Sequence, residues 1–280
     1  MRNIVFLLLS LTVFLPSAIA QPVDTIKVKV HDHIMTFYTC GVGMPTVILE
    51  AGGASDHKSS WQKVQPQLAP FAKVVSYDRP GYLNSEKCNG TRDALTVAKE
   101  LKEALTKLEI KPPYILVGWS LSGSFVRVFA GLYPQDVVGL VLLDPAPENA
   151  YPRYEKDSTY LADKKAHNDR LMSSNKVGQK GEWISFDSSM MQGRRSDTMH
   201  STPTTLLIAA GKADGGQDRD PSDPLNKIWI EELENWAETR PNLNYEIIRN
   251  SGHHIAWFQP DTVVKAILYH INEYRIKAGK

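Results

Sequence analysis

Apolar and polar positions along the chain follow two different spacings. Short runs dominated by apolar and β-branched residues indicate buried strands, and stretches with an apolar residue every three or four positions indicate helices. The strand-like runs are residues 25–30, 34–39, 46–52, 73–78, 114–119, 139–144, 204–211 and 244–249. The helix-like stretches are residues 93–108, 123–133, 225–239 and 261–274.

The order of these runs predicts the fold class. The first two runs are typical of the arms of a hairpin, and the later ones alternate with helical stretches. Such alternation is typical of a mostly parallel sheet. We therefore expect an α/β fold with an eight-stranded, mostly parallel sheet and helices on both faces. A chain of 280 residues fits one such core.

The alternation is interrupted between residues 146 and 203. This segment is rich in Lys, Asp, Ser and Met and has no buried-strand pattern. Because a structureless loop of more than fifty residues is rare inside a compact domain, we expect a small helical lid over one end of the sheet. The core would then consist of residues 21–145 and 204–280. The alternative is that residues 146–203 form a partly disordered loop.

Residues 1–20 have the features of a signal peptide. A short basic start precedes an apolar run at residues 4–15, and small residues follow at Ala18 and Ala20. The run is shorter than the ~20 residues that span a bilayer, so we expect cleavage after Ala20 and no stable membrane anchor afterwards. The expected location is secreted or periplasmic. In that compartment Cys40 and Cys88 could form a disulfide.

Charge narrows the range of partners. The formal net charge is only +1, with 32 Lys and Arg against 31 Asp and Glu. The chain therefore lacks the excess of positive charge that would attract nucleic acid or anionic lipid. We therefore expect a small molecule as the partner, and no nucleic acid.

Three serines follow the strand-like run at 114–119, and one of them is the candidate nucleophile. The strand leads directly into a helix, and a residue at such a turn needs small neighbours two positions away on either side. Ser120 has Gly118 and Ser122 at that spacing and stands at the exit of the strand. Ser122 has equally small neighbours but falls in the first helical turn, where a hydroxyl caps or packs.

The segment around Ser120 resembles the nucleophile elbow of the α/β-hydrolase family, usually G-x-S-x-G. Four more segments are similar to that family in the same order: residues 49–61, 77–85, 211–214 and 251–267. They resemble its oxyanion loop, its D-R-x-G-x-G-x-S stretch, its acid segment and its histidine segment. Two residues depart from the pattern, since Ser122 and Leu83 each replace a glycine.

The resemblance implies a catalytic triad of Ser120, Asp214 and His253, which stand in the family's chain order. It also implies an oxyanion hole formed by the backbone amides of Gly53 and Leu121. A serine hydroxyl is a weak nucleophile until an imidazole takes its proton, and a carboxylate must orient that imidazole. This chemistry needs neither a metal ion nor an organic cofactor.

Two of these assignments have rivals within the chain. Asp144 ends the strand-like run at 139–144 and competes with Asp214 for the role of the acid. His254 directly follows His253, but the family pattern places the catalytic imidazole immediately after the glycine.

The predicted function is an exported serine hydrolase that cleaves a small-molecule carboxylic ester through an acyl-enzyme. A serine at the elbow, rather than an aspartate, disfavours the dehalogenase and epoxide hydrolase branches. An amidase or peptidase, a lipase, a thioesterase, or a non-catalytic binding member of the same fold are the alternatives.

Overall fold

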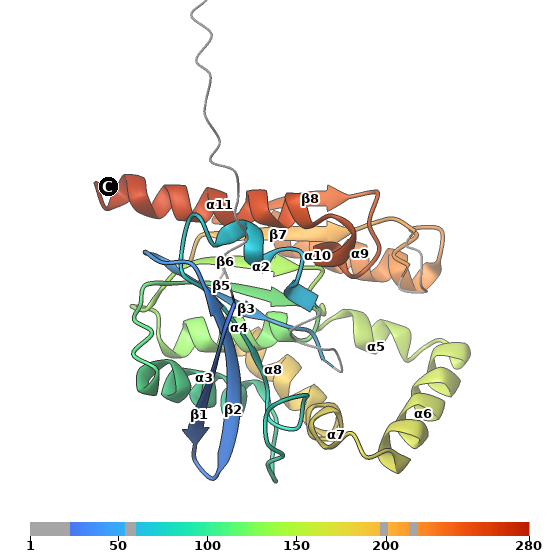
Figure 1. The fold of residues 1–280 in the computed structure, drawn as a ribbon. Helices are drawn as coiled ribbons and strands as arrows, with labels where there is room; N and C mark the ends of the chain where they lie inside the picture. Colours follow the sequence, from blue (N-terminus) through green and yellow to red (C-terminus); the bar gives the residue numbers. More distant parts are fainter. Residues whose placement is uncertain (1–22, 54–59, 197–200, 213–217, 280) are drawn as a thin grey trace, which may run out of the picture.

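The computed structural model describes residues 23–53, 60–196, 201–212 and 218–279, so the expected signal peptide and Asp214 lie outside the described residues. Eight strands form one sheet in the order β1-β2-β4-β3-β5-β6-β7-β8 (Figure 1). The strands are β1 (Asp24–Val30), β2 (His33–Cys40), β3 (Thr46–Glu50), β4 (Val74–Asp78), β5 (Tyr114–Trp119), β6 (Val137–Leu143), β7 (Thr204–Ala209) and β8 (Leu243–Ile248).

The sheet is mostly parallel, as expected. Only β1 with β2 and β2 with β4 pair antiparallel, and every pair from β4 to β8 is parallel. All residues of β3, β4 and β5 are buried, which agrees with their nearly continuous apolar sequence. The prediction of an eight-stranded, mostly parallel sheet is confirmed. The carboxyl ends of the parallel strands meet at one edge, where α/β folds place their sites.

Helices cover both faces of the sheet (Figure 1). One face packs on α3, α4 and α9 through an apolar cluster that includes Phe125, Phe129 and Leu233. The other face packs on α2, α10 and α11 through a second cluster that includes Trp61 and Ile267. The bounds are α2 (Gln65–Leu68), α3 (Ala94–Lys107), α4 (Ser122–Leu132), α9 (Pro224–Glu238), α10 (Ile255–Phe258) and α11 (Pro260–Lys277).

Local sequence signals fix where two of these helices begin. The carboxylate of Asp93 accepts a hydrogen bond of 2.9 Å from the Thr96 N–H at the start of α3. Asp223 caps α9 in the same way, and Pro224 follows as its first residue. Both arrangements satisfy backbone donors that no helical carbonyl can reach.

The segment between β6 and β7 is helical. It contains α5 (Ala150–Tyr154), α6 (Ser158–Ser173), α7 (Val177–Ile184) and α8 (Phe186–Ser196). In α6 only Leu171 is buried, whereas α8 packs against the core through Ser189, Met190 and Gly193. In Figure 1, α5, α6 and α7 extend to the right of the sheet, while α8 runs back under α4.

The two cysteines do not form a disulfide. Both are free thiols, with Cys40 buried in β2 and Cys88 partly buried in the loop before α3. Burial raises the pKa of both thiols. None of the helices in the described part of the chain has the length and apolar character needed to cross a membrane.

Candidate active site

Two neighbouring strands end in residues with a left-handed backbone. Ser120 follows β5 with φ 56°, and Asp144 follows β6 with φ 40°. The Ser120 N–H donates to the Leu143 carbonyl at 3.1 Å, and the Asp144 N–H donates to the Leu207 carbonyl at 2.7 Å. Strained backbone of this kind is common where a side chain must project from a strand end. Both side chains therefore leave the sheet at the same edge.

Ser120 and His253 lie within hydrogen-bond distance of each other. His253 stands between β8 and α10, and its Nε2 lies 2.9 Å from Ser120 Oγ. Its Nδ1 lies 2.6 Å from Asp144 Oδ2. With the proton on Nδ1 donated to the carboxylate, Nε2 presents its lone pair to the serine hydroxyl. This relay has the geometry of an activated nucleophile.

The carboxylate that is hydrogen-bonded to His253 is that of Asp144, the rival acid. Asp214, the expected acid, lies outside the described residues. Asp144 follows β6, which lies one strand further from β8 than β7 does. The left-handed turn at Asp144 places its carboxylate against the Ala209 N–H at the end of β7, where it reaches His253.

Four donors converge on the Asp144 carboxylate, which is fully buried. Oδ1 accepts from the Ala209 N–H at 3.2 Å and from Trp229 Nε1 at 3.0 Å. Oδ2 accepts from Arg219 Nε at 2.8 Å and from His253. Burial opposes ionisation, but the Arg219 charge and the His253 hydrogen bond outweigh it and hold the pKa of Asp144 below its usual value. The acid is thus held ionised and in one orientation.

The imidazole of His253 is held in its neutral form. Burial first, and then the Arg219 charge, lower the pKa of His253, although Asp144 acts in the opposite direction. Arg219 Nη2 lies 3.0 Å from His253 Nδ1, and the guanidinium stacks 4.3 Å from the centre of the Trp229 ring. A neutral imidazole is the form that can accept a proton.

His254 is separate from this relay. Its ring stacks on Trp119 with centroids 4.1 Å apart and an angle of 8° between the planes. Burial lowers the pKa of His254 to about 4, so the ring stays neutral. His254 therefore has a packing role, and the choice of His253 agrees with the geometry.

The two expected oxyanion donors lie side by side. A Cβ atom placed on Gly53 would be 2.9 Å from Leu121 Cδ2 and 3.3 Å from Leu121 Cβ, so the two residues are in close contact. Leu121 directly follows Ser120 and precedes α4, where the helix dipole favours negative charge. Gly53, Ser120 and Leu121 line the same cavity.

Ser122, the unusual residue of the elbow, has a structural role. Its Oγ accepts from the Trp119 N–H at 2.8 Å and lies 2.8 Å from the Glu50 carbonyl oxygen, to which it can donate. The hydroxyl thereby links the end of β5 to the end of β3. Because Ser122 is fully buried and bonded to the backbone, Ser120 is the serine available for chemistry.

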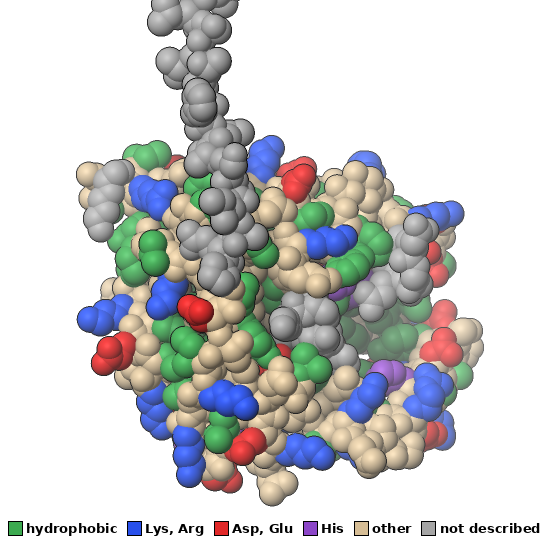
Figure 2. All heavy atoms as spheres, viewed as in Figure 1, with side chains coloured by type: hydrophobic (Ala, Val, Ile, Leu, Met, Phe, Trp, Pro, Cys, Tyr) green, Lys and Arg blue, Asp and Glu red, His purple; other side chains and the backbone are tan. Residues whose placement is uncertain are grey.

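The cavity in front of Ser120 has a volume of about 220 Å³. Its walls combine the elbow and oxyanion loop with side chains from α5 to α8: Tyr151, His167, Leu171, Gln179, Glu182, Trp183 and Phe186. Figure 2 shows a hollow in the surface on the side of α5 to α7, with hydrophobic side chains inside it. Among the described residues, no group of three or more His, Cys, Asp or Glu side chains is arranged to hold a metal ion.

The chain belongs to the α/β-hydrolase fold family, whose sequence model matches residues 45–199. It is 34% identical over 115 residues to a probable transporter of Hormonema carpetanum, covering 40% of this chain and 16% of that one. A monoacylglycerol lipase of Homo sapiens is 33% identical over 103 residues, which cover 35% of this chain and 30% of the lipase. The matches thus span less than half the length of the first curated relatives.

Solved structures extend the likeness over nearly the whole chain. An esterase from Thermogutta terrifontis superposes with a TM-score of 0.61 at 19% identity, covering 89% of this chain and 98% of the esterase. An epoxide hydrolase, a protein of Pseudomonas aeruginosa described as a putative epoxide hydrolase, and a haloalkane dehalogenase of Agrobacterium tumefaciens share the same fold. At this identity the superposition shows the fold alone.

Sequence reasoning missed Arg219 and Trp229, which hold the acid. Arg219 lies in the loop after β7, eight positions from the end of "LLIAAG", and no motif distinguishes it from the other charged residues there. Trp229 lies on the buried, apolar face of α9, and its position in the sequence does not distinguish it from a residue that only packs in the core. Only the folded chain brings both to Asp144.

Proposed function

We propose that the protein is an exported serine hydrolase that cleaves carboxylic esters through an acyl-enzyme. The observation that carries the proposal is the hydrogen-bonded series Ser120, His253 and Asp144, next to the amides of Gly53 and Leu121 and open to an apolar cavity. The family supports a hydrolase in general. The ester as the bond cleaved is our inference from the site.

In the first half-reaction, His253 Nε2 takes the proton from Ser120 as Oγ attacks the ester carbonyl carbon. The carbonyl π electrons move to the oxygen, and the Gly53 and Leu121 N–H groups stabilise the negative charge. The tetrahedral intermediate then collapses, the bond to the alcohol oxygen breaks, and the imidazolium gives its proton to the leaving alkoxide. Asp144 stabilises the imidazolium throughout.

In the second half-reaction, water takes the place of the alcohol. His253 removes a proton from the water as its oxygen attacks the acyl carbon. A second tetrahedral intermediate expels Ser120 Oγ, which recovers the proton from the imidazolium. The products are a carboxylic acid and the free enzyme.

The size and lining of the cavity suit a small acyl group. A cavity of about 220 Å³ that is lined in large part by apolar side chains has room for a short aliphatic chain or one aromatic ring. Leu171, Trp183 and Phe186 offer apolar contact to such a group. We therefore propose short acyl or aryl esters as the substrate class.

Related chemistries use the same relay with a different leaving group, so amides and thioesters are the first alternatives. The serine at the elbow disfavours epoxide and haloalkane opening, because in this fold those reactions begin with a carboxylate nucleophile. A non-catalytic binding role has no need of a neutral imidazole hydrogen-bonded to a serine hydroxyl.

Labelling with a fluorophosphonate probe tests the nucleophile. We expect one adduct, mapped by mass spectrometry to Ser120, and no adduct in Ser120→Ala. Turnover of p-nitrophenyl esters from acetyl to decanoyl, compared with matched anilides and thioesters, then tests the bond and the chain length. Absence of labelling in folded wild-type protein would favour the binding role, and faster anilide than ester turnover would favour an amidase.

Export remains part of the proposal and rests on residues 1–20. Expression of the full chain in a bacterial host, followed by fractionation and amino-terminal sequencing, tests it. We expect a mature chain that begins at Gln21 outside the cytoplasm. An uncleaved chain in the cytoplasm would refute the signal peptide.

A further inference from the structure

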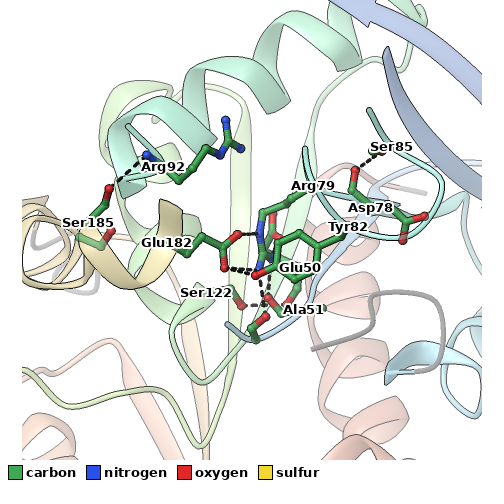
Figure 3. A network of polar contacts seen from close by, with 12 residues as sticks. Glu50, Ala51, Asp78, Arg79, Tyr82, Ser85, Arg92, Ser122, Glu182 and Ser185 are labelled. Carbon is green, nitrogen blue, oxygen red and sulfur yellow. Dashed lines mark hydrogen bonds and ion pairs between the residues drawn. The ribbon is translucent and has the colours of Figure 1, made fainter. Parts of the chain in front are cut away.

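A fully buried arginine lies directly behind the oxyanion loop. Arg79, just after β4, is held by two acids that come from different parts of the chain, as Figure 3 shows. Glu50 ends β3 and contacts Arg79 Nη1. Glu182 comes from α7 and accepts from Nε at 2.5 Å and from Nη2 at 3.0 Å.

The same guanidinium holds the backbone of the oxyanion loop. Arg79 Nη1 donates to the Ala51 carbonyl at 2.7 Å, and Nη2 donates to the Gly52 carbonyl at 2.9 Å. The Gly52 carbonyl and the Gly53 N–H belong to one planar peptide unit, and in a trans peptide they point in opposite directions. By fixing the Gly52 oxygen on one side, Arg79 fixes the direction of the Gly53 N–H on the other.

The oxyanion loop is closely packed and has little room to move if its hydrogen bonds to Arg79 are lost. A Cβ atom on Gly52 would lie 2.9 Å from the Trp119 ring and 3.3 Å from Ser120 Cβ, so the loop already sits against the elbow. A rotation of the 52–53 peptide would turn the Gly53 N–H away from the position of the developing oxyanion, because that N–H and the Gly52 carbonyl turn together.

Glu182 is the part of this network contributed by the inserted helices. Its carboxylate also accepts from the Tyr82 hydroxyl at 2.7 Å, and only 2% of the residue is exposed. Glu182 pairs with Arg79 through both Nε and Nη2, whereas Glu50 contacts Nη1 alone. A buried guanidinium that lost this partner would be costly, so it would turn toward other acceptors.

The backbone of α7 sits against the turn that carries Arg79. A Cβ atom on Gly81 would lie 2.5 Å from the Gly178 nitrogen, and one on Gly178 would lie 2.8 Å from the Pro80 carbonyl oxygen. Contact this close requires glycine on both sides. The position of α7 against this turn therefore also determines whether Glu182 reaches Arg79.

We propose that Glu182 is a positioning residue that acts through Arg79 to aim the Gly53 N–H at the oxyanion. The docked position of α7 and a competent oxyanion hole are then the same state of the protein. This inference rests on the proposed ester hydrolysis, because it assigns a role within that reaction.

The effect should appear in kcat rather than in KM, because the oxyanion exists only after attack. Loss of one oxyanion donor costs ~10²–10³ in kcat, and misdirection of that donor should cost less, about 10–100-fold. We expect this loss in Glu182→Gln, with KM for a short ester changed by less than about threefold. Affinity for a trifluoromethyl ketone, whose adduct carries an oxyanion, should fall in parallel with kcat.

The matched control is Glu100→Gln. Glu100 forms a buried ion pair of 2.7 Å with Arg92, whose side chain packs against Gly181 of α7 and whose backbone N–H donates to the Ser185 hydroxyl just after α7. Among the described residues, the Glu100 carboxylate contacts Arg92 and His33 and does not contact residues 50–53. Glu100→Gln should therefore loosen the packing on α7 to a similar degree while kcat stays within about threefold.

Tyr82→Phe serves as a milder second variant, since it removes one donor from Glu182 and no charge. We expect a loss of kcat of a few fold at unchanged KM. Equal kcat losses in Glu182→Gln and Glu100→Gln, or a rise in KM alone, would overturn the inference. If Glu182→Gln does not fold, wild-type kcat in Tyr82→Phe would overturn it as well. A wild-type protein that neither labels at Ser120 nor turns over any ester refutes the proposed function itself.

Discussion

Replacing Asp144 with asparagine tests the acid of the relay. Each carboxylate oxygen accepts from two donors, so the side chain faces four N–H groups and no acceptor. Asparagine has one oxygen. Whichever way its amide is turned, the NH₂ group faces two donors, and the more favourable arrangement forces His253 to accept at Nδ1. Nε2 then carries the proton and cannot take one from Ser120.

The size of the effect follows from the distance between acid and imidazole. Two unit charges 2.6 Å apart interact by about 6 kcal/mol at an effective dielectric constant of ~20. Part of this is offset by the lower desolvation cost of a neutral side chain. A remaining loss of about 5 kcal/mol corresponds to ~10⁴ in rate, and the wrong imidazole tautomer costs about the same in the serine protease template.

Steady-state turnover of p-nitrophenyl butyrate measures this loss. We expect kcat of Asp144→Asn to fall about 10⁴-fold, and the melting temperature to fall as well, because buried donors lose an acceptor at ~1–3 kcal/mol each. Asp214→Asn is the paired control and should keep kcat within a few fold, since Nδ1 already has a carboxylate. Near-normal turnover in Asp144→Asn with a severe loss in Asp214→Asn would refute the assignment.

Three further substitutions probe the surroundings of the relay. Ser122→Ala should lower the free energy of unfolding by ~1–3 kcal/mol, because the Trp119 N–H loses its acceptor, while kcat stays within about tenfold; a melting curve unchanged from wild type would contradict this. Arg219→Gln removes a positive charge that lowers the pKa of His253, so the acid limb of the pH profile of kcat/KM should move to higher pH; a limb that stays in place would show that burial alone sets it. Trp183→Ala should enlarge the cavity and shift the preference among p-nitrophenyl esters toward longer acyl chains, measured as the ratio of kcat/KM for octanoyl to acetyl, and an unchanged ratio would remove Trp183 from the acyl site.

The fold could be predicted because its signals are local. Buried parallel strands give short apolar runs, and the helical stripe of α3 and the Asp93 cap give bounds within a residue of those observed. Ser120 could be predicted for the same reason, because a strand that leads straight into a helix leaves one position at the turn.

The rest of the site depends on contacts between distant residues. Asp144 and Asp214 both follow strands, and the choice between them depends on the left-handed turn at Asp144. A glycine is the usual sequence signal of such a turn, and here the residue in the left-handed conformation is an aspartate. The contacts of Arg79 with Glu182 join residues 103 positions apart. In α6 a single buried residue leaves little apolar periodicity, so only the length of the segment predicted a helical structure there.

The left-handed turn at Ser120 has a consequence for the history of such a chain. A side chain at φ 56° costs the folded protein energy that glycine would avoid, and among the described residues the Ser120 hydroxyl lies within hydrogen-bond distance of one side chain, that of His253. Folding therefore gains little from a serine at this position. Selection for catalytic turnover is what keeps a serine at position 120. Without that selection, the nucleophile would be lost by mutation before the fold is, and the resulting proteins would be well folded and would retain the apolar cavity.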